Sequence, residues 1–201
     1  MDIIFGSGIH TQNLNNPVLN KKLEKLGRQL TKSSHVTKKS NAGGLQAHAP
    51  DLEHPVILEF LKAATVPLQD LVKHYHIDGD YSFAFQDLWF NLNRTGDYNM
   101  QHAHGNTDFS AVYYMKCESD SGDLVFVNPN QARFLLNLSS VYKFKEYNAI
   151  NSDTYSIKPK PMELCVFPAE LQHYVTRNNN KKDRLSLAFN VKITPIYDKP
   201  Y

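Results

Sequence analysis

The sequence has few features that would direct the protein to an oxidising compartment, a membrane or a charged partner. Only two residues are cysteines, Cys117 and Cys165, so a disulfide framework is not expected and a reducing compartment is favoured. The formal net charge is only +2, which gives no indication of a nucleic acid partner. The apolar runs are too short to cross a bilayer, and Met1–Gly6 lacks the charged-then-apolar order of a signal peptide. We therefore expect a cytoplasmic protein without a membrane segment.

Helical patterns occupy the first 80 residues. Asn16 followed by Pro17 fits an N-cap and a proline at the first helical position. An amphipathic helix is then predicted by four leucines at spacings of four, three and four, namely Leu19, Leu23, Leu26 and Leu30. Residues 31–44 are polar and rich in serine and glycine, which predicts a loop. A second helical region is predicted over residues 53–75, with a break or kink at Pro67.

From Tyr81 onward the pattern changes to short strands. Aromatic and β-branched runs are separated by Gly, Asn, Asp and Pro, which is typical of strands joined by turns. The predicted strands cover residues 81–92, 109–116, 123–127, 154–157, 163–167, 174–176 and 184–194. Helices followed by strands indicate one α+β domain, mainly β, over residues 1–201, with a mainly helical part at 1–80 and a sandwich or barrel core at 81–201.

Two histidines one residue apart, His102 and His104, precede the predicted strand at 109–116. In an extended chain, residues i and i+2 point to the same face and lie about 6.5 Å apart. Both imidazoles could therefore bind one ion through bonds of about 2.1 Å. A second pair of this kind, His74 and His76, falls at the end of a predicted helix, where residues i and i+2 do not face each other. We do not expect that pair to bind a metal.

A third histidine, His173, lies between two predicted strands. On a β scaffold, a His-x-(His or Asp) pair on an early strand and a His on a late strand have the spacing of a facial three-ligand centre. Such a centre usually holds Fe(II) and leaves positions open for a cosubstrate and oxygen. Arg184 and Ser186 share one polar face of the last predicted strand. An arginine and a hydroxyl on one face suit a carboxylate, provided that this face lines a cavity.

These residues resemble the 2-oxoglutarate- and Fe(II)-dependent oxygenases, and in particular a small bacterial and bacteriophage branch related to the prolyl 4-hydroxylases. The most specific part is the ordered set of His102-Ala-His104, His173 and Arg184-Leu-Ser186. The resemblance covers nearly the whole chain and includes the stretches 89–91, 110–114, 167–168, 184–190 and 40–47. The last stretch is similar to a Ser-Asn-x-Gly-Gly-Trp block of the family, but has Leu45 in place of the tryptophan.

The resemblance implies a double-stranded β-helix, that is, a cupin-like jelly-roll core, with the N-terminal helices packed on one sheet. It implies that His102, His104 and His173 hold Fe(II), and that the far carboxylate of the cosubstrate 2-oxoglutarate meets Arg184. The residues implied to line the same cavity are Ser186, Tyr114, Asn91 and Asn190.

The reaction implied by the resemblance is that of a dioxygenase. An unactivated C–H bond is hydroxylated with O2, and succinate and CO2 are released; ascorbate is a candidate reductant. The substrate implied by the prolyl-hydroxylase relatives is a free amino acid or an amino acid side chain in a peptide or protein.

Several alternatives remain open. The broader superfamily has Asp or Glu at the position of His104, which makes Asp108 a rival third ligand. A cupin-like three-histidine dioxygenase that does not use 2-oxoglutarate is one alternative function, and a non-catalytic jelly-roll module with a structural metal is another. Trp89 is expected to pack in the core. The loops at 31–51 and 128–139 are expected to set substrate specificity.

Overall fold

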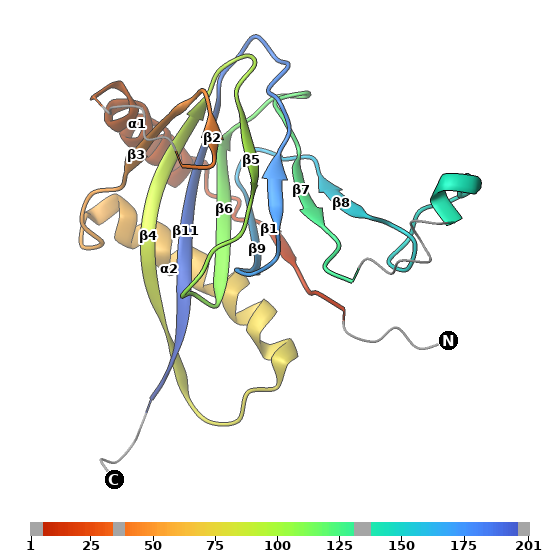
Figure 1. The fold of residues 1–201 in the computed structure, drawn as a ribbon. Helices are drawn as coiled ribbons and strands as arrows, with labels where there is room; N and C mark the ends of the chain where they lie inside the picture. The colour runs from red at the N-terminus through yellow and green to blue at the C-terminus, as the bar shows by residue number, and fades with distance from the viewer. Residues whose placement is uncertain (1–5, 34–38, 131–137, 197–201) are drawn as a thin grey trace.

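The chain folds into two antiparallel β-sheets with two helices on one face, in a computed structural model that describes residues 6–33, 39–130 and 138–196 (Figure 1). The six-stranded sheet has the order β1-β9-β6-β11-β4-β3, and the five-stranded sheet has the order β2-β5-β10-β7-β8. The strands are β1 His10–Asn13, β2 Asn41–Ala42, β3 Leu45–His48, β4 Tyr81–Asn93, β5 Tyr98–His102, β6 Phe109–Lys116, β7 Leu124–Val127, β8 Thr154–Ile157, β9 Glu163–Pro168, β10 His173–Val175 and β11 Arg184–Pro195. The labelled helices are α1 Pro17–Ser33, α2 Pro55–Val72 and the short 3-10 helix η1 Lys73–Tyr75, and residues 138–141 are also helical (Figure 1).

α1 begins where the sequence predicts. The N–H of Leu19 donates to Oδ1 of Asn16 over 3.0 Å, and Pro17 is the first helical residue. Leu19 and Leu23 are fully buried, and the other two leucines of the pattern pack against the same core. The apolar stripe of α1 thus lies on the six-stranded sheet.

Of the break or kink that the sequence predicts at Pro67, the structure excludes the break. The proline lies inside the helix, which continues to Val72. A proline removes one backbone hydrogen bond from a helix. The buried face of α2 outweighs this loss because it packs along its whole length, from Ile57 to Leu71, in the core shared with the sheet. Within the described residues, no helix has the length and apolarity to span a membrane.

The six-stranded sheet has a different apolar layer on each face. Between this sheet and the helices lies the main core, which includes Phe60, Phe90 and Phe189. Between the two sheets lies a smaller cluster, which includes Phe126 and Phe167. The alternation along the strands places successive residues in these two layers, so polar side chains on the inner face reach the space between the sheets.

The alternation of apolar residues along β4 shifts by one position midway along the strand, although the apolar residues stay on the same face of the sheet. The residues that pack against the helical core are Tyr81, Phe83 and Phe85 in the first half, and Leu88, Phe90 and Leu92 in the second half. This one-residue change of phase is readable in the sequence and marks an irregularity in the strand.

The irregularity is a β-bulge. In the pairing with β11, Trp89 lies opposite Ala188 and Gln86 lies opposite Asn190, so two residues of β4 oppose one of β11. Asp87 sits in the bulge with φ +46°, a left-handed conformation that aspartate adopts more readily than most residues. The bulge allows the residues after it to face the space between the sheets at every second position.

Four strands were not predicted from the sequence, namely β1, β2, β3 and β5. Their sequences, HTQN, NA, LQAH and YNMQH, contain few β-branched or aromatic residues. They become strands because they pair with longer neighbours, for example β1 with β9 and β3 with β4.

Replacing Phe60 by alanine should lower the free energy of unfolding by about 3–5 kcal/mol. Its ring is fully buried and packs against the rings of Tyr113 and Phe189 at centroid distances of 5.2 and 5.7 Å. Urea denaturation measures the change. The control is Leu58→Ala on the same helix, whose side chain is 43% exposed and whose loss should cost less than about 1 kcal/mol. Equal stabilities of the two variants would contradict this description of the core.

Candidate active site

Three imidazoles from two distant parts of the chain converge between the two sheets. His102 ends β5, and His173, which begins β10, lies opposite it in the strand pairing. His104 follows in the next loop, where its N–H donates to the backbone oxygen of Ala169 over 2.9 Å. One ring nitrogen of each histidine lies within 4.8 Å of those of the other two. Nitrogens bound to one ion at about 2.1 Å are at most about 4.2 Å apart, so small side-chain rotations suffice to close the set around a metal.

Backbone carbonyls orient two of these rings. Nδ1 of His102 lies 2.7 Å from the oxygen of Met100, and Nδ1 of His173 lies 2.9 Å from the oxygen of Leu171. A carbonyl can only accept a hydrogen bond, so each Nδ1 carries the proton and each Nε2 keeps its lone pair. Proteins commonly orient metal-binding histidines in this way.

Burial keeps the three imidazoles neutral. Desolvation, together with the neighbouring His102 ring, lowers the pKa of His173 to about 3 and that of His104 to about 4. Desolvation also lowers the pKa of His102. At neutral pH all three rings are therefore neutral, with one ring nitrogen free of a proton, which is the state that binds a metal ion.

The imidazoles border a cavity of about 480 Å³ that both sheets line. The polar face of β11 runs along it through Arg184, Ser186 and Asn190. Tyr114 of β6 and Asn91 of β4 also line the cavity, and both are register partners of Ser186. One row across the neighbouring strands β4, β11 and β6 therefore contains Asn91, Ser186 and Tyr114.

Arg184 is a buried cation without a carboxylate partner. Its side chain is 2% exposed, and its Nη1 donates to the backbone oxygens of Ser121 (3.0 Å) and Gly122 (3.2 Å). Its Nε is buried without a hydrogen-bond partner, and none of the ion pairs among the described residues includes it. Desolvation lowers the pKa of Arg184. A buried charge is costly unless it is paired, so this end of the cavity suits an anionic ligand.

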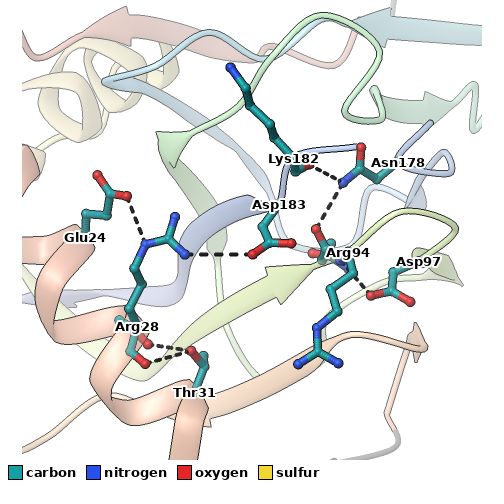
Figure 2. A network of polar contacts seen from close by, with 10 residues as sticks. Glu24, Arg28, Thr31, Arg94, Asp97, Asn178, Lys182 and Asp183 are labelled. Atoms are coloured by element: carbon teal, nitrogen blue, oxygen red, sulfur yellow. Dashed lines mark hydrogen bonds and ion pairs between the residues drawn. The ribbon is translucent and has the colours of Figure 1, made fainter. Parts of the chain in front are cut away.

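A polar network holds the turn that leads to Arg184 (Figure 2). Asn178 is fully buried, and its Nδ2 donates to the backbone oxygen of Asn93 over 3.0 Å. Asp183 lies 3.8 Å from Arg28 of α1. Together these contacts fix the start of β11 relative to β4 and to the helical layer.

Asp108, the rival third ligand, does not join the histidine cluster. Its Oδ2 accepts a hydrogen bond of 2.7 Å from the backbone N–H of Ile193, so the carboxylate is engaged near the end of β11. The structure brings His104 and not Asp108 to the other two imidazoles. His74 and His76 are exposed at the end of η1, in a separate part of the molecule.

Sequence reasoning missed part of the cavity wall. The expectation that Trp89 packs in the core was wrong, because its half-buried indole lines the cavity and lies 5.9 Å from the His104 ring. Asp87 and Ser110 also line the cavity. The change of apolar phase in β4 is the signal that could have placed residues 87, 89 and 91 on the inner face. Of the two loops expected to set specificity, residues 34–38 and 131–137 lie outside the described residues.

Comparisons with known proteins agree with this geometry. Residues 87–190, just over half of the chain, match the model of a family described as "Putative 2OG-Fe(II) oxygenase". Among curated proteins, none matches the sequence.

Solved structures resemble the fold at low sequence identity. A prolyl-4-hydroxylase from Pseudomonas putida has 16% identity and a TM-score of 0.64, with 92% of each chain covered. The viral collagen prolyl hydroxylase of Paramecium bursaria Chlorella virus-1, in complex with 2OG, has 16% identity and a TM-score of 0.60, with 91% and 94% covered. The α-ketoglutarate-dependent epimerase SnoN has 11% identity and a TM-score of 0.66, with 92% and 78% covered. The fold is thus the double-stranded β-helix, as the resemblance to the oxygenases implies.

The metal-free protein should become less stable as the pH falls below about 6.5. In the unfolded chain an imidazole takes up a proton near pH 6.5, whereas His173 does so only at about pH 3 and His104 at about pH 4. Between these values the unfolded state binds more protons, so each imidazole contributes a loss of about 1.4 kcal/mol per pH unit. Urea denaturation with a chelator present, at several pH values, measures the slope. His173→Asn should reduce the slope by about 1.4 kcal/mol per pH unit, because one proton fewer is taken up on unfolding. An unchanged slope would refute the argument.

Proposed function

Since the chain belongs to the 2OG-Fe(II) oxygenase family, we propose that it hydroxylates an unactivated C–H bond of a peptidyl or free amino acid, with release of succinate and CO2. One observation carries this proposal. Three neutral imidazoles and a buried, unpaired arginine face the same cavity. The likeness to two prolyl hydroxylases supports an amino acid substrate.

In this proposal His102, His104 and His173 hold Fe(II). Three neutral nitrogen ligands suit a divalent first-row metal and leave part of its coordination sphere open. When bound, Fe(II) supplies the redox chemistry that couples O2 and the keto acid to hydroxylation. The three imidazoles bring no negative charge, so the dianion of 2-oxoglutarate would balance the charge of the ion. The hydrogen bonds to the oxygens of Met100 and Leu171 keep two of the rings aimed at the site.

Arg184 would bind the far carboxylate of 2-oxoglutarate. The unpaired Nε and the remaining Nη protons can form a charge-assisted pair of hydrogen bonds with one carboxylate. Ser186 and Tyr114 would each add a hydroxyl. Burial raises the pKa of Tyr114, so its hydroxyl keeps the proton that it would donate. Asn91 and Asn190 would complete the polar lining.

The two alternative functions account for fewer of these features. A three-histidine dioxygenase that uses no 2-oxoglutarate has no need of a buried cation such as Arg184. A structural metal site is normally closed by protein ligands, whereas these imidazoles border a cavity.

Cys117 and Cys165 are buried and unpaired, which fits a role in a reducing compartment.

Replacing Arg184 by alanine should raise the 2-oxoglutarate concentration needed for half-maximal succinate release on the order of 100-fold, because the substitution removes a buried charge partner. Succinate release is measured with Fe(II), ascorbate and 2-oxoglutarate. The matched control is Arg94→Ala, which removes an exposed arginine outside the cavity and should leave this concentration unchanged. If Arg184→Ala turned over like the parent protein, the assignment of the cosubstrate pocket would be wrong.

Metal binding should distinguish His104 from Asp108. His104→Ala should weaken Mn(II) binding at least about 100-fold, because it removes a ligand, and even the residues that orient ligands are worth about 10–100-fold. Asp108→Asn should change the affinity less than about threefold, since its carboxylate accepts a hydrogen bond from Ile193. Isothermal titration calorimetry measures both variants, and the exposed His76→Ala serves as control. The opposite order of effects would make Asp108 the ligand.

A further inference from the structure

The cavity carries a carboxylate that the proposed iron and 2-oxoglutarate sites do not use. Asp87 lines the cavity and is exposed, so it lies at the mouth. Among the described residues, no lysine, arginine or histidine lies within ion-pair distance of its carboxylate. Asp87 is thus an unpaired negative charge beside a proposed metal site.

Neighbouring side chains fix the orientation of this carboxylate. Ser110 Oγ donates to Oδ1 of Asn190 over 2.8 Å, which turns the amide nitrogen of Asn190 toward Asp87. That nitrogen lies 3.5 Å from Oδ2 of Asp87. The β-bulge directs the side chain into the cavity from a backbone with φ +46°.

An aromatic side chain of the same strand lines the cavity together with this carboxylate. Trp89 lines the same cavity two residues along β4, and its ring lies 5.9 Å from the His104 ring. An indole attracts a cation to its face, and a guanidinium can also stack on it. A carboxylate and an indole on one wall therefore form a chemically matched pair for an ammonium or guanidinium group.

One charge of the opposite sign lies at the mouth. Lys39 also lines the cavity and is exposed, and it does not pair with Asp87 within ion-pair distance. Its ammonium opposes the binding of a second cation. Removing this charge should therefore strengthen cation binding if Asp87 and Trp89 form the site.

We propose that Asp87 and Trp89 form a subsite for a positively charged group of the substrate, an ammonium or a guanidinium on or beside the residue that is hydroxylated. This inference rests on the proposed function, because it places the cation next to the His102, His104 and His173 site. It narrows the substrate class from amino acids in general to basic ones, or to chains with a basic residue or an amino terminus near the target.

Trp89 provides the measurement, because it is the only tryptophan in the sequence. Its fluorescence reports ligands at the subsite, with or without metal. The probes are N-butylguanidinium and N-butylurea, which have the same shape and differ in charge. The protein loaded with Mn(II) and 2-oxoglutarate should bind the cation about five- to tenfold more tightly than the urea, as expected for one carboxylate and one indole at a partly exposed site.

Variants identify the residue that is responsible for the preference for the cation over the urea. Asp87→Asn keeps the shape and the contact with Asn190 but should reduce the preference for the cation to near unity, and Asp87→Glu should restore part of it. Lys39→Gln should increase the preference. The matched control is Asp80→Asn, an exposed aspartate just before β4 and outside the cavity, which should leave the preference unchanged.

The inference is overturned if the parent protein binds the two probes equally, or if Asp87→Asn keeps the preference. Failure of the proposed function has a different signature. In that case Mn(II) binding or succinate release is absent in the parent protein, while the fluorescence titration can still be read in the metal-free protein.

Discussion

The structure depends on β11, whose two faces lie in different surroundings. Leu185, Leu187, Phe189 and Val191 are buried against the helical layer. The intervening residues include buried polar side chains that line the cavity between the sheets, namely Arg184, Ser186 and Asn190. Because β11 pairs with β4 on one side and β6 on the other, it also sets the register of the strands that carry Asn91 and Tyr114. One strand thus links the stability of the core to the composition of the cavity.

Desolvation gives the candidate site its chemical character. The same burial that keeps His104 and His173 neutral leaves Arg184 charged but unpaired. The protein therefore places lone pairs at one end of the cavity and positive charge at the other. Neither arrangement stabilises the fold by itself, since an unpaired buried cation is costly. Both fit a ligand that brings negative charge to the arginine and chelates a metal at the imidazoles.

Much of the fold could be predicted because the local pattern and the tertiary environment agree. The bounds of β6 and β8 match the predicted strands, and α1 starts at Pro17. Prediction failed where an element owes its structure to its neighbours. The chain at Tyr98–His102 is polar and becomes a strand only by pairing with β2 and β10. Pro67 stays helical because the packing of α2 outweighs the missing hydrogen bond.

By itself, the sequence determined the alternation of β11, the leucine stripe of α1 and the types of side chain available for a metal and a carboxylate. These depend on residue identity and on periods of two and 3.6 residues, which are local properties. Only the tertiary structure decided that His173 lies opposite His102, that Asp108 is engaged elsewhere and that the inner face of β4, with Asp87 and Trp89, lines a cavity. These outcomes depend on strand register and on a one-residue bulge, and register is set by pairing between segments far apart in the chain.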